Sequence, residues 1–350
     1  LYWHHAKPYR KEKDPEFSTY GGIHKKLKGN LSSLSFSEII EKAQRLLQQV
    51  AEIDFKYRNT ETSLINRIYS AMVDLDSLDN IKTTPLPSYK TYELENRIDD
   101  YRQQITTNAL HNLMRACVIS ADRLISGLSA EDLHNHIRHQ TLHCLVEETL
   151  LSESSLCSQI RSCMTQFPSS ERTSKQHEIA VQLNKVSNIA VLSGPAGCGK
   201  TKIALEWAML KNTQQIIWIC PRVQVCQGLF LELTSEQYLP DANIEINTGE
   251  FKYTKKWGKE TAEDDYFSGD IVITTIDQVF SAIITHTKVN TLINVLNAHV
   301  VFDEFHEYVA MPAFNLLFAE LIECKKSQGS LANTLLVSAT PHYFFLNTVM

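Results

Sequence analysis

The feature that most constrains the fold is the stretch at 193–201, S-G-P-A-G-C-G-K-T, which contains the G-x-x-x-x-G-K-[ST] pattern of a phosphate-binding loop. It follows a short apolar run at 189–192 and precedes a helix-forming segment at 202–210. Backbone N–H groups of such a loop turn toward a phosphate, and the amino terminus of the following helix adds partial positive charge. The sequence therefore predicts a strand, a loop and a helix that together bind phosphate.

The residues of this loop have separate expected roles. Gly194, Gly197 and Gly199 allow the backbone to turn its N–H groups inward. Lys200 is expected to reach the β and γ phosphate oxygens, and Thr201 is expected to offer its hydroxyl group to Mg²⁺.

The chain divides into two parts with different patterns. Residues 1–165 show helical spacing of apolar residues, and residues 166–173 form a polar, Pro- and Ser-containing segment that predicts a linker. The predicted helices span 38–55, 62–75, 92–126 and 130–151. Within 174–350, short Val- and Ile-rich runs alternate with helical segments, which predicts a parallel sheet covered on both faces. The predicted strands span 189–192, 215–220, 270–276, 299–302 and 335–337.

Composition narrows the functional classes. The 350 residues have a formal net charge of −6, which argues against a basic coat over the whole surface, and 43% of them are hydrophobic, as in soluble globular proteins. Eight cysteines without a C-x-x-C pair indicate reduced thiols in a cytoplasmic protein. No apolar run approaches the roughly 20 residues that span a membrane. Because the first residue is Leu1 and not Met, we expect sequence to precede it.

Two adjacent carboxylates, Asp303 and Glu304, follow the apolar run at 299–302. Asp303 is expected to hold Mg²⁺ through water, and Glu304 is expected to orient the water that attacks the γ-phosphate. Other polar motifs end other apolar runs: P-R at 221–222, T-T-I-D-Q at 274–278 and S-A-T at 338–340. The carboxyl ends of parallel strands share one edge of a sheet, so we expect these motifs to lie at one ligand site.

In order and spacing, the motifs between Arg172 and Thr340 resemble the first RecA-like lobe of superfamily 2 DExH helicases. The resemblance implies ATP with Mg²⁺ as the ligand, an α/β P-loop fold for this half, and recognition of adenine by Gln176. The residues implied to couple hydrolysis to strand movement are His306, Ser338 and Thr340. The residues implied to lie near the nucleic-acid backbone are Arg222, Thr275 and Gln278.

The helical half contains a second set of chemically active side chains. W-H-H-A-K-P at 3–8 provides the imidazoles of His4 and His5, and S-A-D-R-L-I-S at 120–126 provides the carboxylate of Asp122. Together with F-D-E-F-H-E at 302–307, these stretches resemble the CRISPR-associated HD-nuclease/helicase of type I systems, particularly its subtype I-F form. The resemblance implies that residues 1–165 are the carboxyl-terminal portion of an all-α HD domain.

The same resemblance implies the chemistry and the partners. His4, His5 and Asp122 would hold two divalent metal ions, from among Mn²⁺, Fe²⁺, Co²⁺ and Ni²⁺, that activate water to cut single-stranded DNA. The implied partners are single-stranded DNA, a Cascade-type CRISPR surveillance complex and the adaptation integrase, without a membrane. The missing His-Asp dyad would precede Leu1 and a second RecA-like lobe would follow Met350, so we expect residues 1–350 alone neither to cut nor to unwind DNA.

Two other functional classes remain open. A restriction-type DNA translocase would keep every motif of the lobe and give His4, His5 and Asp122 no metal role. A non-enzymatic scaffold would bind nucleotide as a switch, without turnover stimulated by DNA.

A different metal site is also conceivable in the helical half. Its members would share one face of the helix predicted at 130–151, and they are His136, His139, His143 and Glu147. No cysteine or carboxylate pair at conventional spacing completes it, so a solvated helix face is the preferred interpretation.

Overall fold

The computed structural model describes residues 98–141, 155–256, 259–261, 267, 269–285, 289–310, 312–341 and 343–349, together with Arg45. The chain divides into two compact units, Leu1–Ser88 and Tyr89–Met350. Apart from Arg45, every described residue belongs to the second unit. The helices predicted at 38–55 and 62–75, and the candidate metal ligands His4 and His5, lie outside the described residues.

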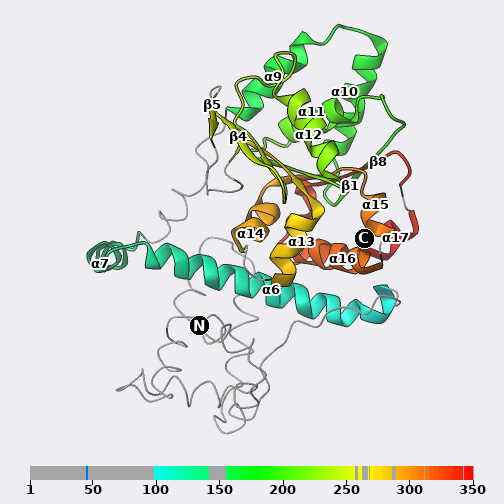
Figure 1. The fold of residues 1–350 in the computed structure, drawn as a ribbon. Coiled ribbons are helices and arrows are strands. Elements are labelled where there is room, and N and C mark those ends of the chain that lie inside the picture. Colours follow the sequence, from blue (N-terminus) through cyan, green and yellow to red (C-terminus); the bar gives the residue numbers. More distant parts are fainter. Residues whose placement is uncertain are drawn as a thin grey trace, which may run out of the picture. The chain divides into compact units, whose positions relative to one another are not determined.

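A central sheet organises the second unit (Figure 1). Within the described residues it has eight strands, in the spatial order β1 (Ala190–Ser193), β8 (Thr334–Ser338), β7 (His299–Phe302), β2 (Ile216–Cys220), β6 (Ile271–Thr275), β3 (Ile244–Asn247), β4 (Lys252–Lys256) and β5 (Lys259–Thr261). Neighbours from β1 to β3 are parallel, whereas β4 and β5 add an antiparallel edge. The prediction of a RecA-like α/β lobe with a mostly parallel sheet is therefore confirmed.

All five predicted strands are present, and the sheet also contains β3, β4 and β5, which the sequence pattern does not predict. Strand β3 reads I-E-I-N, and its Glu245 is buried. The backbone N–H groups of Phe267 and Gly269 donate to the Glu245 carboxylate at 2.8 and 3.3 Å. These partners come from distant sequence, so the polar residue inside β3 hides the strand from a search for apolar runs.

Alternate residues of each central strand face opposite sides of the sheet, and both sides are covered (Figure 1). On β2, for example, Ile217 and Ile219 enter one core while Ile216 and Trp218 enter the other. One side carries α9 (Leu156–Gln166), α10 (Glu171–Asn184), α11 (Lys200–Leu210) and α12 (Val223–Leu233). The other carries α6 (Ile98–Ser126), α13 (Ile276–Thr285), α14 (Val289–Asn297), α15 (His306–Val309), α16 (Pro312–Ser327) and α17 (Tyr343–Val349). The prediction of a sheet covered on both faces is confirmed.

Helix α6 packs along α16 (Figure 1). The contact is polar at one point, where Asn112 and Asn108 donate to the fully buried Glu320 carboxylate at 2.6 and 3.3 Å. A buried carboxylate is tolerated only when hydrogen-bond donors replace the water that it loses. Because both donors come from α6, they fix the register of α6 on the lobe.

The segment predicted as a linker, 166–173, contains the loop at 167–170 between α9 and α10. Ser170 caps α10 by accepting a hydrogen bond from the Thr173 N–H at 3.1 Å. On the other side of the loop, α9 packs against α11 and buries Leu156 and Ile160 in the core between the sheet and helices α9 to α12. The segment thus lies inside the second compact unit.

The helix predicted at 130–151 is wrong in its length, because α7 spans Ala130–His139. Gln140 adopts a left-handed conformation with φ of 57°, and the Thr141 N–H donates back to the His136 carbonyl at 2.9 Å. This capping ends the helix.

In the part of the chain that the structure describes, no helix has the length and apolar character to cross a membrane.

Candidate active site

The phosphate loop joins β1 to α11, as the sequence predicts. Gly197 and Gly199 have φ of +76° and +90°, a region that side chains with a Cβ rarely occupy. A Cβ on Gly199 would also lie 2.3 Å from Nε2 of Gln176. Conformation and close packing together explain the glycine at this position.

Gln176 lies against the phosphate loop. Its side chain is 7% exposed, and its Nε2 donates to the Cys198 carbonyl at 2.8 Å. One helical turn earlier, the Arg172 guanidinium donates to the Gly197 carbonyl. Gln176, the residue expected to recognise adenine, and Arg172 therefore both brace the loop from α10.

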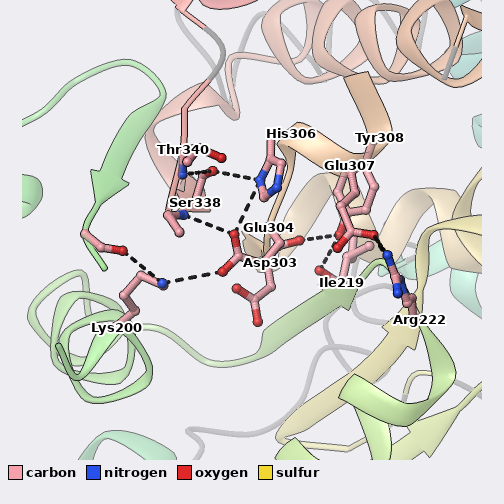
Figure 2. A network of polar contacts seen from close by, with 12 residues as sticks. Lys200, Ile219, Arg222, Asp303, Glu304, His306, Glu307, Tyr308, Ser338 and Thr340 are labelled. Atoms are coloured by element: carbon pink, nitrogen blue, oxygen red, sulfur yellow. Dashed lines mark hydrogen bonds and ion pairs between the residues drawn. The ribbon is translucent and has the colours of Figure 1, made fainter. Parts of the chain in front are cut away.

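Lys200, the first residue of α11, points its ammonium group across the mouth of the loop (Figure 2). Its Nζ donates to the Gly194 carbonyl at 3.0 Å and lies 3.4 Å from Oε1 of Glu304. Only 14% of the Lys200 side chain is exposed, so this charge pair is only weakly screened by water. The lysine predicted to bind phosphate and the carboxylate predicted to orient water are thus in contact.

Asp303 and Glu304 follow β7 directly, and the Asp303 N–H donates to the Ile219 carbonyl of the neighbouring strand at 2.8 Å. Glu304 has φ of 45°, which is unfavourable for a residue with a Cβ and costs on the order of 1 kcal/mol. Because of this backbone conformation, the two adjacent carboxylates point in different directions, and that of Glu304 points toward Lys200 (Figure 2).

The environment of Asp303 suits a divalent cation. Burial, followed by the nearby charge of Glu304, raises the pKa of the Asp303 carboxyl above its ordinary value. A cation that arrives with a nucleotide would offset both causes, and the Asp303 carboxylate and the Thr201 hydroxyl are the oxygen ligands that Mg²⁺ prefers. Bound Mg²⁺ would neutralise charge on the phosphate oxygens.

The D-E-x-H and S-A-T motifs meet at the carboxyl ends of β7 and β8 (Figure 2). The Glu304 carboxylate accepts from the Ala339 N–H at 3.0 Å and lies 3.4 Å from Nδ1 of His306. The same Nδ1 lies 2.8 Å from Oγ of Ser338, which accepts from the Thr340 N–H at 3.0 Å. The structure therefore brings together all three residues expected to couple hydrolysis to movement.

Sequence reasoning misses Tyr308, which is buried behind this network. Its hydroxyl lies 2.8 Å from the Ile219 carbonyl and 2.7 Å from the Asp303 carbonyl (Figure 2). Burial, more than the nearby thiol of Cys220, raises the pKa of the Tyr308 phenol well above its ordinary value, so the hydroxyl keeps its proton. A single aromatic residue two positions after D-E-x-H is not a sequence signal that could have identified Tyr308 as part of the site.

The three expected nucleic-acid contacts lie at the ends of adjacent strands, since Cys220 of β2 pairs with Thr275 of β6. Arg222, 67% exposed, donates through Nε and Nη2 to Oε2 of Glu307 at 3.0 and 2.9 Å. Gln278 is half-buried, whereas Thr275 is buried with 3% exposure and offers little side-chain surface. The structure places Arg222 and Gln278 better for contact with a partner than Thr275.

The candidate nuclease residues are only partly covered by the structure. Asp122 is half-buried on α6, and His4 and His5 lie outside the described residues. Among the residues with a described position, no group of three or more His, Cys, Asp or Glu side chains is arranged to hold a metal ion. Instead, Nδ1 of His136 lies 3.0 Å from Oγ1 of Thr141, and Nδ1 of His139 lies 2.9 Å from the Asn135 carbonyl of the same helix. His143 and Glu147 lie outside the described residues.

Comparison with curated proteins finds no match to the chain. The family model of the DEAD/DEAH box helicases matches residues 173–347, half of the chain. The match includes the phosphate loop, D-E-x-H and S-A-T, the segments that form the network described above. An ATP-dependent helicase fits both the match and the geometry, and the chain belongs to the DEAD/DEAH box helicase family.

Proposed function

We propose that this chain provides the ATP-hydrolysing lobe of a motor that moves along single-stranded DNA. The observation that carries the proposal is the continuous set of polar contacts from Lys200 through Glu304 to His306 and Ser338. A change at the phosphate end of this network reaches the S-A-T segment through side chains in direct contact. These contacts support the proposal of a route from hydrolysis to movement.

The chain's residues divide the work in this mechanism. Backbone N–H groups of the loop and the Lys200 ammonium bind the phosphates, and Lys200 then exchanges its contact with Glu304 for phosphate oxygens. The released Glu304 carboxylate orients a water and accepts its proton. His306, which contacts both Glu304 and Ser338, transmits that change of charge to β8.

The test compares Lys200→Ala and Glu304→Gln in a longer chain that includes the expected second lobe, with the exposed Glu131→Gln on α7 as control. We expect Lys200→Ala to lose ATP binding. Glu304→Gln should bind ATP normally and lose DNA-stimulated turnover by about 100-fold or more, as for removal of a general base. Turnover by Glu304→Gln at the wild-type rate would contradict the assigned role, and ATP binding without any response to DNA would favour the nucleotide-switch scaffold.

We further propose that the parent protein is a CRISPR-type nuclease-helicase in which His4, His5 and Asp122 hold divalent metal ions. Support comes from W-H-H-A-K-P and S-A-D-R-L-I-S in the same chain as a helicase lobe, and from Asp122 on a helix that packs against that lobe. The implied partners are single-stranded DNA, the surveillance complex and the adaptation integrase.

Cleavage of labelled single-stranded DNA by the longer chain tests this finer proposal, with Mn²⁺ or Ni²⁺ and without ATP. Wild type should cut, EDTA should stop cleavage, and Asp122→Ala should be inactive while it still hydrolyses ATP. Asp132→Ala, on the exposed surface of α7, is the matched control. Equal behaviour of Asp122→Ala and wild type would favour the restriction-type translocase.

A further inference from the structure

The carboxyl edge of the sheet continues past the expected nucleic-acid contacts toward β3 and β4. Strand β3 pairs in parallel with β6, and the Thr274 hydroxyl of β6 donates to the Asn247 carbonyl at the end of β3 at 2.6 Å. Beyond β3, Gly249 lies beside Gln278, since a Cβ on Gly249 would be 3.6 Å from Nε2 of Gln278. The turn after β3 is therefore adjacent to a residue already expected to face nucleic acid.

That turn is held firmly from within. The Thr248 N–H donates to the Phe251 carbonyl at 2.7 Å, and the Phe251 N–H donates to the Thr248 hydroxyl at 2.9 Å. Thr248 itself is fully buried. Strand β4 leaves this turn antiparallel to β3, with Tyr253 opposite Ile246. The first residues of β4 are thus positioned by hydrogen bonds within the turn and by pairing with β3.

Two aromatic side chains and a lysine are presented there. Phe251 and Tyr253 are 37% and 43% exposed, and Lys252 between them is exposed. Phe251 directly precedes β4, and Lys252 and Tyr253 are the first two residues of the strand. We call these three residues the β4 aromatic surface.

Charge distinguishes this edge from the rest of a chain with a net charge of −6. Strand β4 contains three lysines and no carboxylate, and β5 begins with a fourth lysine. Among the described residues of the turn, β4 and β5, the carboxylates are Glu250 in the turn and Glu260 of β5, which pairs in register with Lys255. Within these described residues, four lysines outnumber two carboxylates, and this excess of positive charge complements phosphate.

We infer that a single-stranded nucleic acid held at Arg222 and Gln278 continues over the β4 aromatic surface. Phe251 and Tyr253 stack on its bases, and Lys252 contacts a phosphate. Stacking requires bases that are not already paired and stacked in a duplex, so the occupant is single-stranded. The inference rests on the proposed function and adds to it a base-dependent contact.

The test measures binding of labelled oligonucleotides to the chain by fluorescence anisotropy at fixed salt, with an oligo-dT strand and an abasic strand of the same length. Phe251→Ala with Tyr253→Ala should weaken binding of oligo-dT by about tenfold or more and leave the abasic strand unaffected. Lys252→Gln should weaken both strands and lower the slope of log affinity against log salt by about 1. Ile137→Ala, exposed at 57% on α7, serves as control for loss of a surface apolar side chain.

A second variant separates stacking from misfolding. Phe251→Tyr with Tyr253→Phe keeps both rings and should bind oligo-dT as wild type does. Equal binding of oligo-dT by wild type and the double alanine variant, or equal losses on oligo-dT and on the abasic strand, would overturn the stacking contact while the motor proposal stands. Failure of wild type to bind any single strand would overturn both proposals, whereas an oligo-rU strand bound tighter than oligo-dT would retain the surface and reassign its occupant to RNA.

Discussion

His306 Nδ1 and Ser338 Oγ lie 2.8 Å apart, although 32 residues separate them in sequence. The contact joins the end of D-E-x-H to the start of S-A-T at the carboxyl ends of two adjacent parallel strands. Because Ser338 Oγ also accepts the Thr340 N–H, the hydroxyl proton can point to the imidazole. One side chain therefore fixes both the conformation of S-A-T and the orientation of His306.

Ser338→Ala should uncouple ATP hydrolysis from strand binding. Removal of the hydroxyl frees His306 and the Thr340 N–H, so we expect stimulation of turnover by single-stranded DNA to fall by about tenfold, with little change in ATP affinity. Turnover of the longer chain with and without DNA measures the effect. Ser330→Ala is the control. It removes a hydroxyl that lies outside the site and donates to the Lys325 carbonyl at 3.0 Å, so this variant should keep full stimulation by DNA. An unchanged stimulation ratio in Ser338→Ala would refute the coupling role.

The sequence predicts the parts of this site whose constraints are local. The phosphate loop is recognisable because Gly199 and Lys200 perform their roles within one turn of backbone, and the predicted strands are recognisable because both faces of the central sheet are apolar. Glu245 of β3 accepts from a donor 22 residues away, and Tyr308 joins Asp303 to a strand 89 residues away. No local pattern predicts such distant contacts. The early end of α7 at Gln140 shows the same limit, since a left-handed residue other than glycine gives little signal in sequence.

Gly199→Ala should impair nucleotide binding and stability together. The left-handed backbone costs about 1 kcal/mol for a residue with a Cβ, and the new methyl group also displaces Gln176. We expect a loss of about 1–3 kcal/mol in the free energy of unfolding and at least tenfold weaker ATP binding, measured by denaturant unfolding and by titration with a fluorescent ATP analogue. Gly197→Ala meets no atom within 4 Å and should show the backbone cost alone.

Gly228→Ala provides the matched control, because Gly228 lies inside α12 with open space around its Cβ position. Alanine should stabilise the helix there by about 1 kcal/mol. Equal effects of Gly199→Ala and Gly228→Ala on stability would show that neither the backbone conformation of Gly199 nor its packing against Gln176 disfavours a Cβ there.

Stability should fall as pH decreases from about 6.5 toward 4 because of His299. Burial, followed by the charges of Lys325 and Lys211, lowers the pKa of His299 from 6.5 to about 4 in the folded chain. As pH falls through this window the unfolded chain takes up a proton that the folded chain excludes, so the free energy of unfolding decreases by about 2–3 kcal/mol. His299→Gln should flatten this decrease in urea unfolding across pH 4–7. The exposed His134→Gln is the control, and a decrease as steep in His299→Gln as in wild type would rule out His299 as its source.

Tyr308→Phe should weaken Mg²⁺-dependent steps more than nucleotide binding itself. The Ile219 carbonyl keeps the Asp303 N–H as a donor at 2.8 Å, whereas the Asp303 carbonyl loses the hydroxyl that lies 2.7 Å away. A partly buried carbonyl left without its donor costs about 1 kcal/mol, and the lost contact is to the backbone of the carboxylate expected to hold Mg²⁺. We therefore expect a higher Mg²⁺ concentration for half-maximal ATP turnover in the longer chain, with ATP binding in EDTA unchanged. Tyr343→Phe, exposed at 67%, should behave as wild type. A loss of stability in Tyr308→Phe with an unaltered Mg²⁺ dependence would show that the hydroxyl supports the fold alone and does not position Asp303.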